Sequence, residues 1–269
     1  MRLLTVLLAL APAALARPPA AELRAYLEES AGAPVAAAPA VWRITGSFGL
    51  TATSGNAETF TFAGGLEAVR ERAPWKLAVE ADSIVSRSEG EETANEQILT
   101  ERLERALGER GALFQELLGE HDEQEELDFR LQLTLGYQRR LVDRERFRLW
   151  GEAGGGVLHE EFRLDPETEG VLRFGLRFEW RITDQLLFTQ RFAFDPSLSR
   201  GGEFRLLSES VFSTPVGERV DLRLSILDTF DSDPQPGVGR NDVKIALTLA
   251  IAFTRKRRDV KTETGSRAP

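Results

Sequence analysis

A strict alternation of large apolar residues with small or polar ones is the sequence feature that most constrains the fold. It is clearest in residues 243–253, where Val, Ile, Leu, Leu, Ile and Phe occupy the odd positions and Lys, Ala, Thr, Ala and Ala the even ones. Residues 127–138 and 174–182 repeat the pattern. Successive side chains of a strand point to opposite faces, so each segment predicts a β-strand between an apolar and a polar medium.

The alternation extends over twelve segments, an even number, as bacterial outer-membrane barrels require. The segment 93–107 is the least regular, because Leu99, Leu103 and Leu107 also fit one face of a helix. A lone helix would interrupt the succession of hairpins, so we expect a strand there. The predicted strands are 41–54, 58–70, 74–86, 93–107, 111–121, 126–141, 145–161, 168–182, 185–195, 202–214, 218–231 and 241–254.

The connections between these segments alternate in length. Tight turns are predicted at 71–74, 108–111, 142–144, 183–184 and 215–218. Longer, acidic or Gly/Pro-rich loops are predicted at 88–92, 120–126, 165–169, 196–202 and 231–240, and the first connection, 54–56, is short. Short periplasmic turns and longer outer loops are usual in barrels, so both ends of the barrel chain are expected in the periplasm.

Strand length separates a membrane barrel from a soluble sandwich. Many segments have 12 or more residues, against a usual strand length of about 5–6 and the roughly 9–11 that a tilted membrane strand needs. A meander of hairpins also closes on itself and removes open edges. We therefore predict an all-β fold, a 12-stranded antiparallel up-and-down transmembrane β-barrel over residues 41–254. A soluble periplasmic β domain is the alternative.

The N-terminal residues have the features of an export signal. Arg2 precedes the apolar run 3–10, and Ala14-Leu15-Ala16 forms a small-x-small cleavage site. The run is shorter than the roughly 20 residues of a spanning helix, which disfavours a retained anchor. We predict a signal peptide at 1–16, an Ala/Pro-rich periplasmic lead-in at 17–40, a basic and polar tail at 255–269, and an outer-membrane location.

Composition argues against cysteine chemistry and against a nucleic-acid partner. The chain has no cysteine, so it forms no disulfide and offers no thiolate. Its net charge of −9 and isoelectric point of about 5.1 disfavour nucleic acid, although residues 255–258 are basic. The expected partners are outer-membrane lipid, lipopolysaccharide and, during biogenesis, the barrel-assembly machinery. The sequence does not define an oligomeric state.

The sequence offers little for catalysis. His121 and His159 are the two histidines, and neither lies beside a nucleophilic serine motif. Residues 154–156 are three glycines that lack the Lys-Ser/Thr and the helix of a phosphate loop. The acidic loops have no calcium-loop spacing, so a solvated face is favoured over a cation site. We predict no enzyme activity and no cofactor, with an outer-membrane barrel enzyme acting on lipid as the alternative.

Charged residues at inward positions form the candidate functional site. A positively lined wall would make a narrow pore that favours anions. A network of Arg and Glu would instead close the modest interior that twelve strands enclose, and we favour this interpretation. Trp42, Trp75 and Trp180 are expected in an interfacial girdle, and Trp150 inside. The interior candidates are Glu152, Arg173, Arg177, Glu179, Arg181, Arg191, Arg205, Glu209 and Arg223.

The order of short motifs resembles a known family. Residues 53–59 (TSGNAET), 117–120 (LLGE), 135–138 (LGYQ) and 151–156 (GEAGGG) are similar to segments of the domain-of-unknown-function 481 family, also described as salt-induced outer-membrane proteins. The resemblance implies an outer-membrane barrel with a role in salt or osmotic stress and no established activity. Family members end at a terminal aromatic residue, whereas 16 residues follow Phe253 here. Phe253 is the candidate assembly signal.

Overall fold

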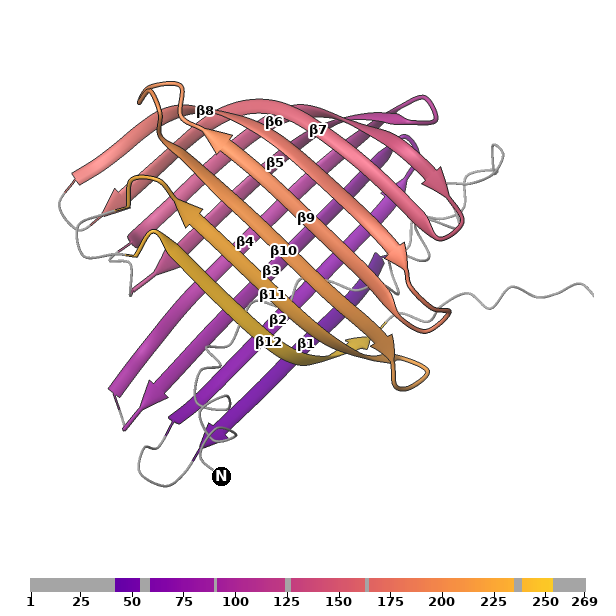
Figure 1. Cartoon of the computed structure of the whole chain (residues 1–269), viewed down its shortest axis with the longest axis horizontal. Helices are drawn as coiled ribbons and strands as arrows, with labels where there is room; N and C mark the ends of the chain where they lie inside the picture. The colour runs from indigo at the N-terminus through magenta and orange to yellow at the C-terminus, as the bar shows by residue number, and fades with distance from the viewer. Residues whose placement is uncertain are drawn as a thin grey trace, which may run out of the picture.

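The computed structural model describes residues 42–53, 59–89, 91–123, 127–162, 165–234 and 239–253. Each strand pairs antiparallel with its neighbours in sequence, and β1 pairs with β12 to close the barrel (Figure 1). The predicted fold class is confirmed, and residues 93–107 belong to a strand rather than a helix. The strands are β1 (Trp42–Thr53), β2 (Thr59–Arg72), β3 (Trp75–Ser88), β4 (Glu91–Leu107), β5 (Gly111–Asp122), β6 (Leu127–Arg144), β7 (Phe147–Phe162), β8 (Asp165–Arg181), β9 (Leu187–Pro196), β10 (Phe204–Pro215), β11 (Val220–Asp231) and β12 (Asn241–Ala252).

The predicted signal peptide, lead-in and C-terminal tail lie outside the described residues, as does the predicted turn at 54–56. No helix among the described residues is long and apolar enough to cross a membrane.

The alternation of the sequence becomes the two faces of the barrel wall. On β12, Ala246, Thr248 and Ala250 are buried inside, whereas Ile245 and Leu247 are exposed outside. The same division recurs around the barrel, so the outer surface is apolar and matches a lipid environment. Large apolar residues exposed on that surface include Phe48, Leu50, Phe62, Leu66, Leu99, Leu113, Leu133, Leu135, Val157, Phe174, Leu176, Phe192, Leu206, Leu224, Ile245 and Leu247.

Both ends of the barrel chain and the even-numbered connections lie at one end of the barrel, which we call the turn end. The opposite end is the loop end. Trp42, Trp75 and Trp180 are exposed close to the turn end, at the ends of their strands. The rings of Trp42 and Trp75 lie 5.6 and 5.5 Å from the guanidinium carbons of Arg70 and Arg105. Aromatic rings flanked by cations are typical of a membrane interface.

Several connections differ from the prediction. β3 ends at Ser88 and β4 begins at Glu91, so the loop expected at 88–92 is a two-residue connection. Residues 165–169, also expected in a loop, begin β8, and the turn expected at 142–144 lies at 145–146. These segments are charged on both faces, so they show no apolar alternation even though their backbone continues the ladder. The expected contrast between short turns and long loops holds only in part.

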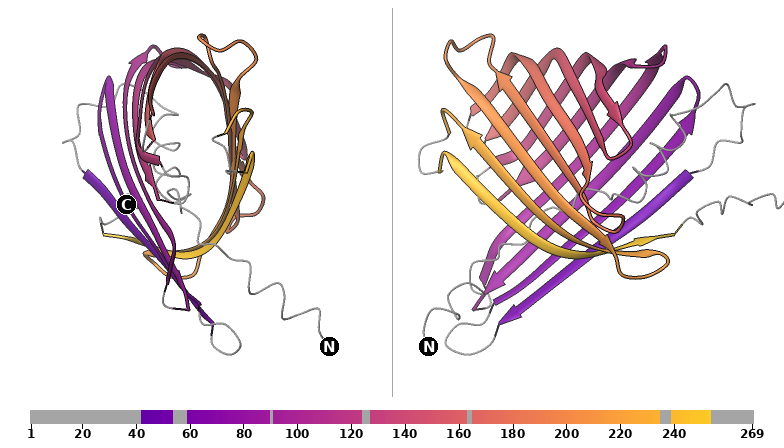
Figure 2. Two further views of the ribbon diagram at one scale, coloured as in Figure 1. Left: turned by 90° about the vertical axis from the view of Figure 1, so that its left-hand side faces the viewer. Right: turned by 45° about the vertical axis from the view of Figure 1, so that its right-hand side comes forward.

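Closure is confined to part of the last pair of strands. The β1–β12 ladder runs only from Thr45–Ala252 to Phe48–Leu249, and the amide of Phe253 donates to the carbonyl of Ile44 at 2.9 Å. Figure 2 shows an elongated ring that narrows where β12 approaches β1.

An apolar cluster holds the two sides of this narrow part together. Leu227 of β11 packs against Ala63 and Ile84 of β2 and β3, with Ala94 and Ile98 of β4 beside them. Toward the loop end, side chains that meet across the lumen therefore hold the two sides of the barrel together, because the β1–β12 ladder does not extend there.

The glycines of β7 allow its close approach to β6. A Cβ on Gly156 would lie 1.9 Å from the carbonyl oxygen of Leu133, and one on Gly154 would lie 2.5 Å from that of Leu135. Glycine therefore permits backbone curvature here, as expected for glycine within a barrel strand.

Candidate functional site: the charged interior

The interior contains charged side chains at three levels between the loop end and the turn end. Most are buried although they are charged, so each needs a partner. Among the sequence candidates, Arg173, Glu179, Glu209 and Arg223 are the most buried, with exposed fractions of 8%, 2%, 6% and 1%.

Arg102 of β4 is the centre of the middle level. Its guanidinium donates to Glu104, to Glu116 and to Glu152, each at 2.8 Å, and contacts Gln138 at 3.3 Å. These partners come from β4, β5, β6 and β7, so a single side chain ties four strands together. The guanidinium also lies 4.1 Å from the ring of Phe114.

Arg173 of β8 extends the middle level across the interior. It donates through Nη1 to Glu116 at 2.5 Å, and through Nε and Nη2 to Asp195 at 2.9 and 2.5 Å. The pair with Asp195 has the two-pronged geometry that makes Arg–carboxylate contacts strong. Glu116 therefore accepts from both Arg102 and Arg173.

The level near the loop end is built around Arg130 of β6. It donates to Glu120 and Glu160, both at 2.6 Å. Arg205 of β10 donates to the same Glu160 at 2.7 Å and to Asp231 at 2.8 Å. Arg130 and Arg205 thus share the carboxylate of Glu160, which links β7 to β10.

One ion pair crosses the interior where the barrel is narrow. Lys244 of β12 lies 2.7 Å from Glu96 of β4 and 3.2 Å from Asp242. Glu96 is 5% and Lys244 17% exposed. Because β12 and β4 do not pair, this contact supplements the apolar cluster around Leu227.

The level near the turn end is less connected. The guanidinium of Arg177 lies 4.5 Å from the ring of Trp150, which is buried inside the barrel as expected from its parity. Glu179 is buried, and neither of its carboxylate oxygens makes a hydrogen bond among the described residues. Arg181 ends β8 and contributes a backbone hydrogen bond to Arg146.

The remaining candidates lie on β9, β10 and β11. Arg191 lies 3.7 Å from Glu209 on the neighbouring strand. Arg223 borders a cavity of about 10 Å³ together with Glu67, Glu80 and Asp82. A space of this size holds at most one water molecule.

Sequence parity predicted inward arginines but only some of their partners. Arg191 and Glu209, both candidates, lie beside each other, whereas the candidate Glu152 binds Arg102 of β4. The central residues Arg102, Glu116, Arg130 and Glu160 were missed as site residues. Their even positions within β4, β5, β6 and β7 are the signal that would have placed them inside.

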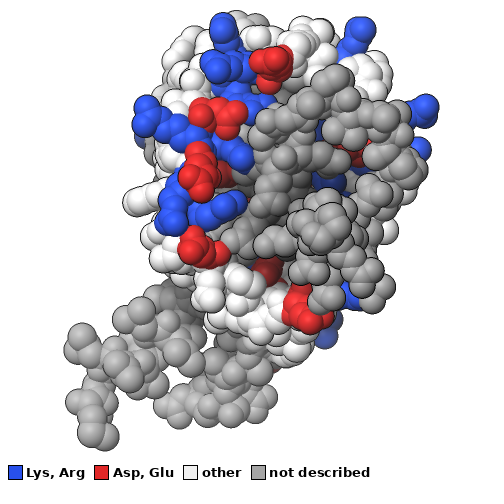
Figure 3. Space-filling view, turned by 90° about the vertical axis from the view of Figure 1, so that its right-hand side faces the viewer, with Lys and Arg blue, Asp and Glu red and all other residues white. Residues whose placement is uncertain are grey.

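The rim at the turn end is also charged. Asp143 lies 2.5 Å from Arg140 and 3.2 Å from Arg148, and Arg146 lies 3.0 Å from Asp184. Figure 3 views the molecule from the turn end and shows acidic and basic side chains alternating along one side of the rim. The described charges of this rim are therefore interspersed rather than separated by sign.

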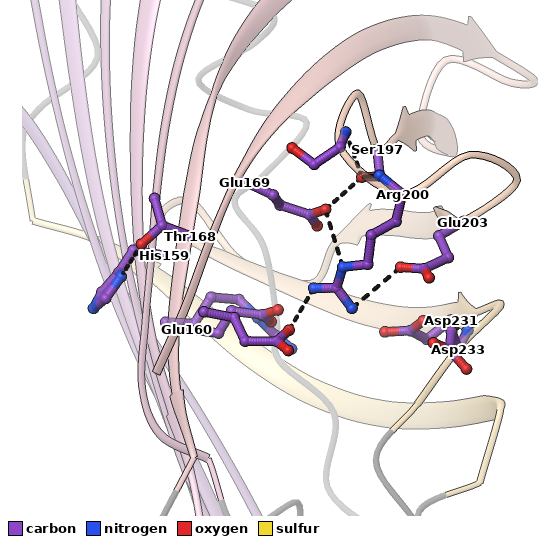
Figure 4. Close-up of polar contacts among 12 residues, drawn as sticks. His159, Glu160, Thr168, Glu169, Ser197, Arg200, Glu203, Asp231 and Asp233 are labelled. Carbon is purple, nitrogen blue, oxygen red and sulfur yellow. Dashed lines mark hydrogen bonds and ion pairs between the residues drawn. The ribbon is translucent and has the colours of Figure 1, made fainter. Parts of the chain in front are cut away.

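The loop between β9 and β10 forms a second charged rim at the loop end (Figure 4). Arg200 contacts Glu167, Glu169 at 3.6 Å and Glu203 at 3.2 Å, and Ser197 donates to Glu169. Partial burial lowers the pKa of Arg200, but the three carboxylates outweigh this effect and raise it. Desolvation raises the pKa of Glu203 and, together with Asp233 and the neighbouring glutamates, outweighs the opposing effect of Arg200.

The histidines lack a serine partner among the described residues. His159 Nδ1 contacts the hydroxyl of Thr168 at 2.7 Å (Figure 4), and His121 Nδ1 contacts the carbonyl of Asp128 at 2.9 Å. No three His, Asp or Glu side chains in the described part of the chain are arranged to hold a metal ion.

A closed antiparallel barrel with an apolar outer surface and a charged interior defines the class of transmembrane β-barrel proteins. Residues 46–253 match the family described as protein of unknown function, DUF481. The chain therefore belongs to this family, as its motifs predicted.

Solved structures with a similar course of the chain include two porins and an outer membrane channel. The KdgM porin matches with a TM-score of 0.43 and 6% identity, over 80% of this chain and 100% of that one. The NanC porin matches with a TM-score of 0.48 and 8% identity, over 79% of this chain and 100% of that one. An outer membrane channel from Pseudomonas putida F1 matches with a TM-score of 0.46 and 10% identity, over 82% of this chain and 97% of that one. No curated protein matches the sequence.

Proposed function

We propose that the protein is an outer-membrane barrel with a structural role, whose charged interior closes the lumen instead of conducting ions. The observation that carries this proposal is a set of ion pairs between strands that are not neighbours. Arg173 joins β8 to β5, Arg205 joins β10 to β7, and Lys244 joins β12 to β4. Neighbouring strands are about 4.8 Å apart, so contacts between strands three or four apart pass through the lumen.

Charge balance supports closure over an anion pore. A selective pore needs an excess of one charge facing an open path. Here each central arginine is matched by carboxylates: Arg102 by Glu104, Glu116 and Glu152, and Arg130 by two more. In the middle and loop-end levels, the arginines that would attract anions are therefore already paired with carboxylates of the protein.

The apolar surface and the predicted export signal support an outer-membrane location. The apolar outer face would contact membrane lipid, and the charged rim around Arg200 would lie near the lipopolysaccharide headgroups. Insertion would use the barrel-assembly machinery, with Phe253 as its recognition residue. A role in salt or osmotic stress rests on family resemblance, and chain levels in cells grown at low and high salt would test it.

Planar-bilayer recording tests the closed interior. We expect the purified wild-type barrel to give no steady conductance, and the double variant Lys244→Ser/Arg102→Ser to give one. The surface variant Arg146→Ser is the matched control, since its pair with Asp184 is exposed. Reproducible, anion-selective conductance of the wild type would refute closure and favour the pore.

Two further measurements test location and activity. Recovery of the mature protein with soluble periplasmic proteins after carbonate extraction would contradict a membrane location. Lipid hydrolysis that is abolished in His159→Ala would favour the alternative of a barrel enzyme.

A further inference from the structure

Two rows of phenylalanines in ring contact cross the outward faces of β7 to β11. Neighbouring rings in each row lie 4.6–6.4 Å apart. Position 208 of β10 is midway between Phe204 of one row and Phe212 of the other. The row near the loop end is Phe174, Phe194, Phe204 and Phe230, and the row near the turn end is Phe147, Phe178, Phe188 and Phe212.

A polar group lies on the outward surface at this midpoint. Gln190 donates to Ser208 at 3.1 Å, and Ser210 donates to Gln190. Asp228 of β11 is the register partner of Ser208, and it shares the outward parity of Leu224 and Phe230. Its Oδ1 is buried and has no hydrogen-bond partner among the described residues. A carboxylate at this depth is costly in lipid, which makes it a marker of function.

A groove of about 780 Å³ adjoins the polar group. Its outward lining includes Ala153, Phe192, Leu206, Ser208 and Asp228. Lipid tails can fill the apolar part of such a groove, but they have no donor for Asp228. A partner that brings a hydrogen-bond donor to this depth would satisfy the carboxylate.

We propose that the occupant is a second copy of this chain, bound through the outward surface of β9, β10 and β11. Two copies inserted in the same direction are related by a twofold axis along the membrane normal, which keeps every residue at its own depth. Ser208 and Asp228 are register partners, so a donor and an acceptor lie side by side at nearly one depth. Such an axis brings the Ser208 hydroxyl of each copy to the Asp228 of the other, and small residues allow close approach.

Energy transfer in vesicles tests this interface. A single dye site at Gly201→Cys suits the cysteine-free chain, because nothing lies within 4 Å of a side chain there. In phosphatidylcholine vesicles we expect transfer between copies to rise with the protein-to-lipid ratio. Asp228→Leu should raise the ratio for half-association at least tenfold.

Glu101→Leu is the matched control. Glu101 is also an outward carboxylate, but it lies on β4, six strands from the centre of the proposed interface at β10, and Gln115 of its own chain donates to it at 3.4 Å. Its removal should leave association unchanged. A wild-type barrel that stays monomeric at every ratio, or equal effects of the two substitutions, would overturn the proposal. Monomeric behaviour would exclude a second copy as the occupant, and equal effects would exclude Asp228 as the contact between copies.

Oxidative cross-linking keeps the proposal testable if Asp228→Leu does not fold. Ile226 lies beside the polar group on the outward face of β11, and Leu99 is 53% exposed on β4. Ile226→Cys should form a covalent dimer in vesicles, whereas Leu99→Cys should not. Equal cross-linking at both sites, or none at Ile226→Cys, would refute the interface.

Discussion

The ion pair between Lys244 and Glu96 gives the sharpest test of the closed interior. Replacing Lys244 by Met leaves Glu96, which is 5% exposed, without its nearest cation. Removing one partner of a buried pair typically costs about 3–5 kcal/mol. Lys244 retains 17% exposure, so we expect the lower end, about 3 kcal/mol, or roughly a hundredfold in the folding equilibrium.

The double variant Lys244→Met/Glu96→Met separates pairing from simple loss of a side chain. Replacing both partners by apolar groups is often neutral, so the double variant should be more stable than either single variant. Ile98 and Leu227 of the nearby apolar cluster favour this outcome. Urea unfolding followed by tryptophan fluorescence measures the free energy of unfolding of all three variants.

The exposed pair between Arg146 and Asp184 is the control for this cycle. Their side chains are 56% and 85% exposed, so Arg146→Met should cost at most about 1 kcal/mol. The buried pair across the lumen would be refuted if Lys244→Met and Glu96→Met each lowered the free energy of unfolding by less than about 0.5 kcal/mol and their effects added in the double variant.

Three further predictions concern the same wall. Arg102→Met, which leaves Glu104, Glu116 and Glu152 without their shared cation, should destabilise the barrel by at least about 3 kcal/mol in urea unfolding, and Arg102→Lys should recover part of this loss. Gly156→Ala should abolish the band of the folded barrel in gel electrophoresis, since its Cβ would lie 1.9 Å from a carbonyl oxygen. Gly201→Ala, which has open space around it, should keep that band. Phe253→Ala should slow assembly in membranes, whereas Leu249→Ala on the same strand should not; equal rates would exclude Phe253 as the assembly signal.

The period of two in the sequence was sufficient to predict the twelve strands and the faces of their residues, because parity is a local property. It placed Trp150 inside and Trp180 outside without any knowledge of neighbouring strands. It was less reliable where both faces are charged. The segment 139–144 carries three arginines and an aspartate, and β6 continues through it with a register shift to Arg144.

Partners across the lumen depend on a global property, the stagger of strands around the closed ring. Lys244 and Glu96 are 148 positions apart, and nothing local to either residue specifies their contact. The outward polar group differs in this respect. Positions 222, 224, 226 and 230 are Leu, Leu, Ile and Phe, so parity alone would have marked Asp228 as an anomaly on the lipid-facing surface.

The closed interior couples two properties that an open pore keeps separate. In a pore, a wall charge faces water, so its removal changes ion flow and has little effect on folding. In a seal, the same charge is buried against a partner from a distant strand, so its removal both opens a path and destabilises the barrel. Across substitutions at Lys244, Arg102 and Arg173, conductance should therefore rise as the free energy of unfolding falls. Variants that conduct at full stability would show that water, rather than a partner, surrounds these side chains.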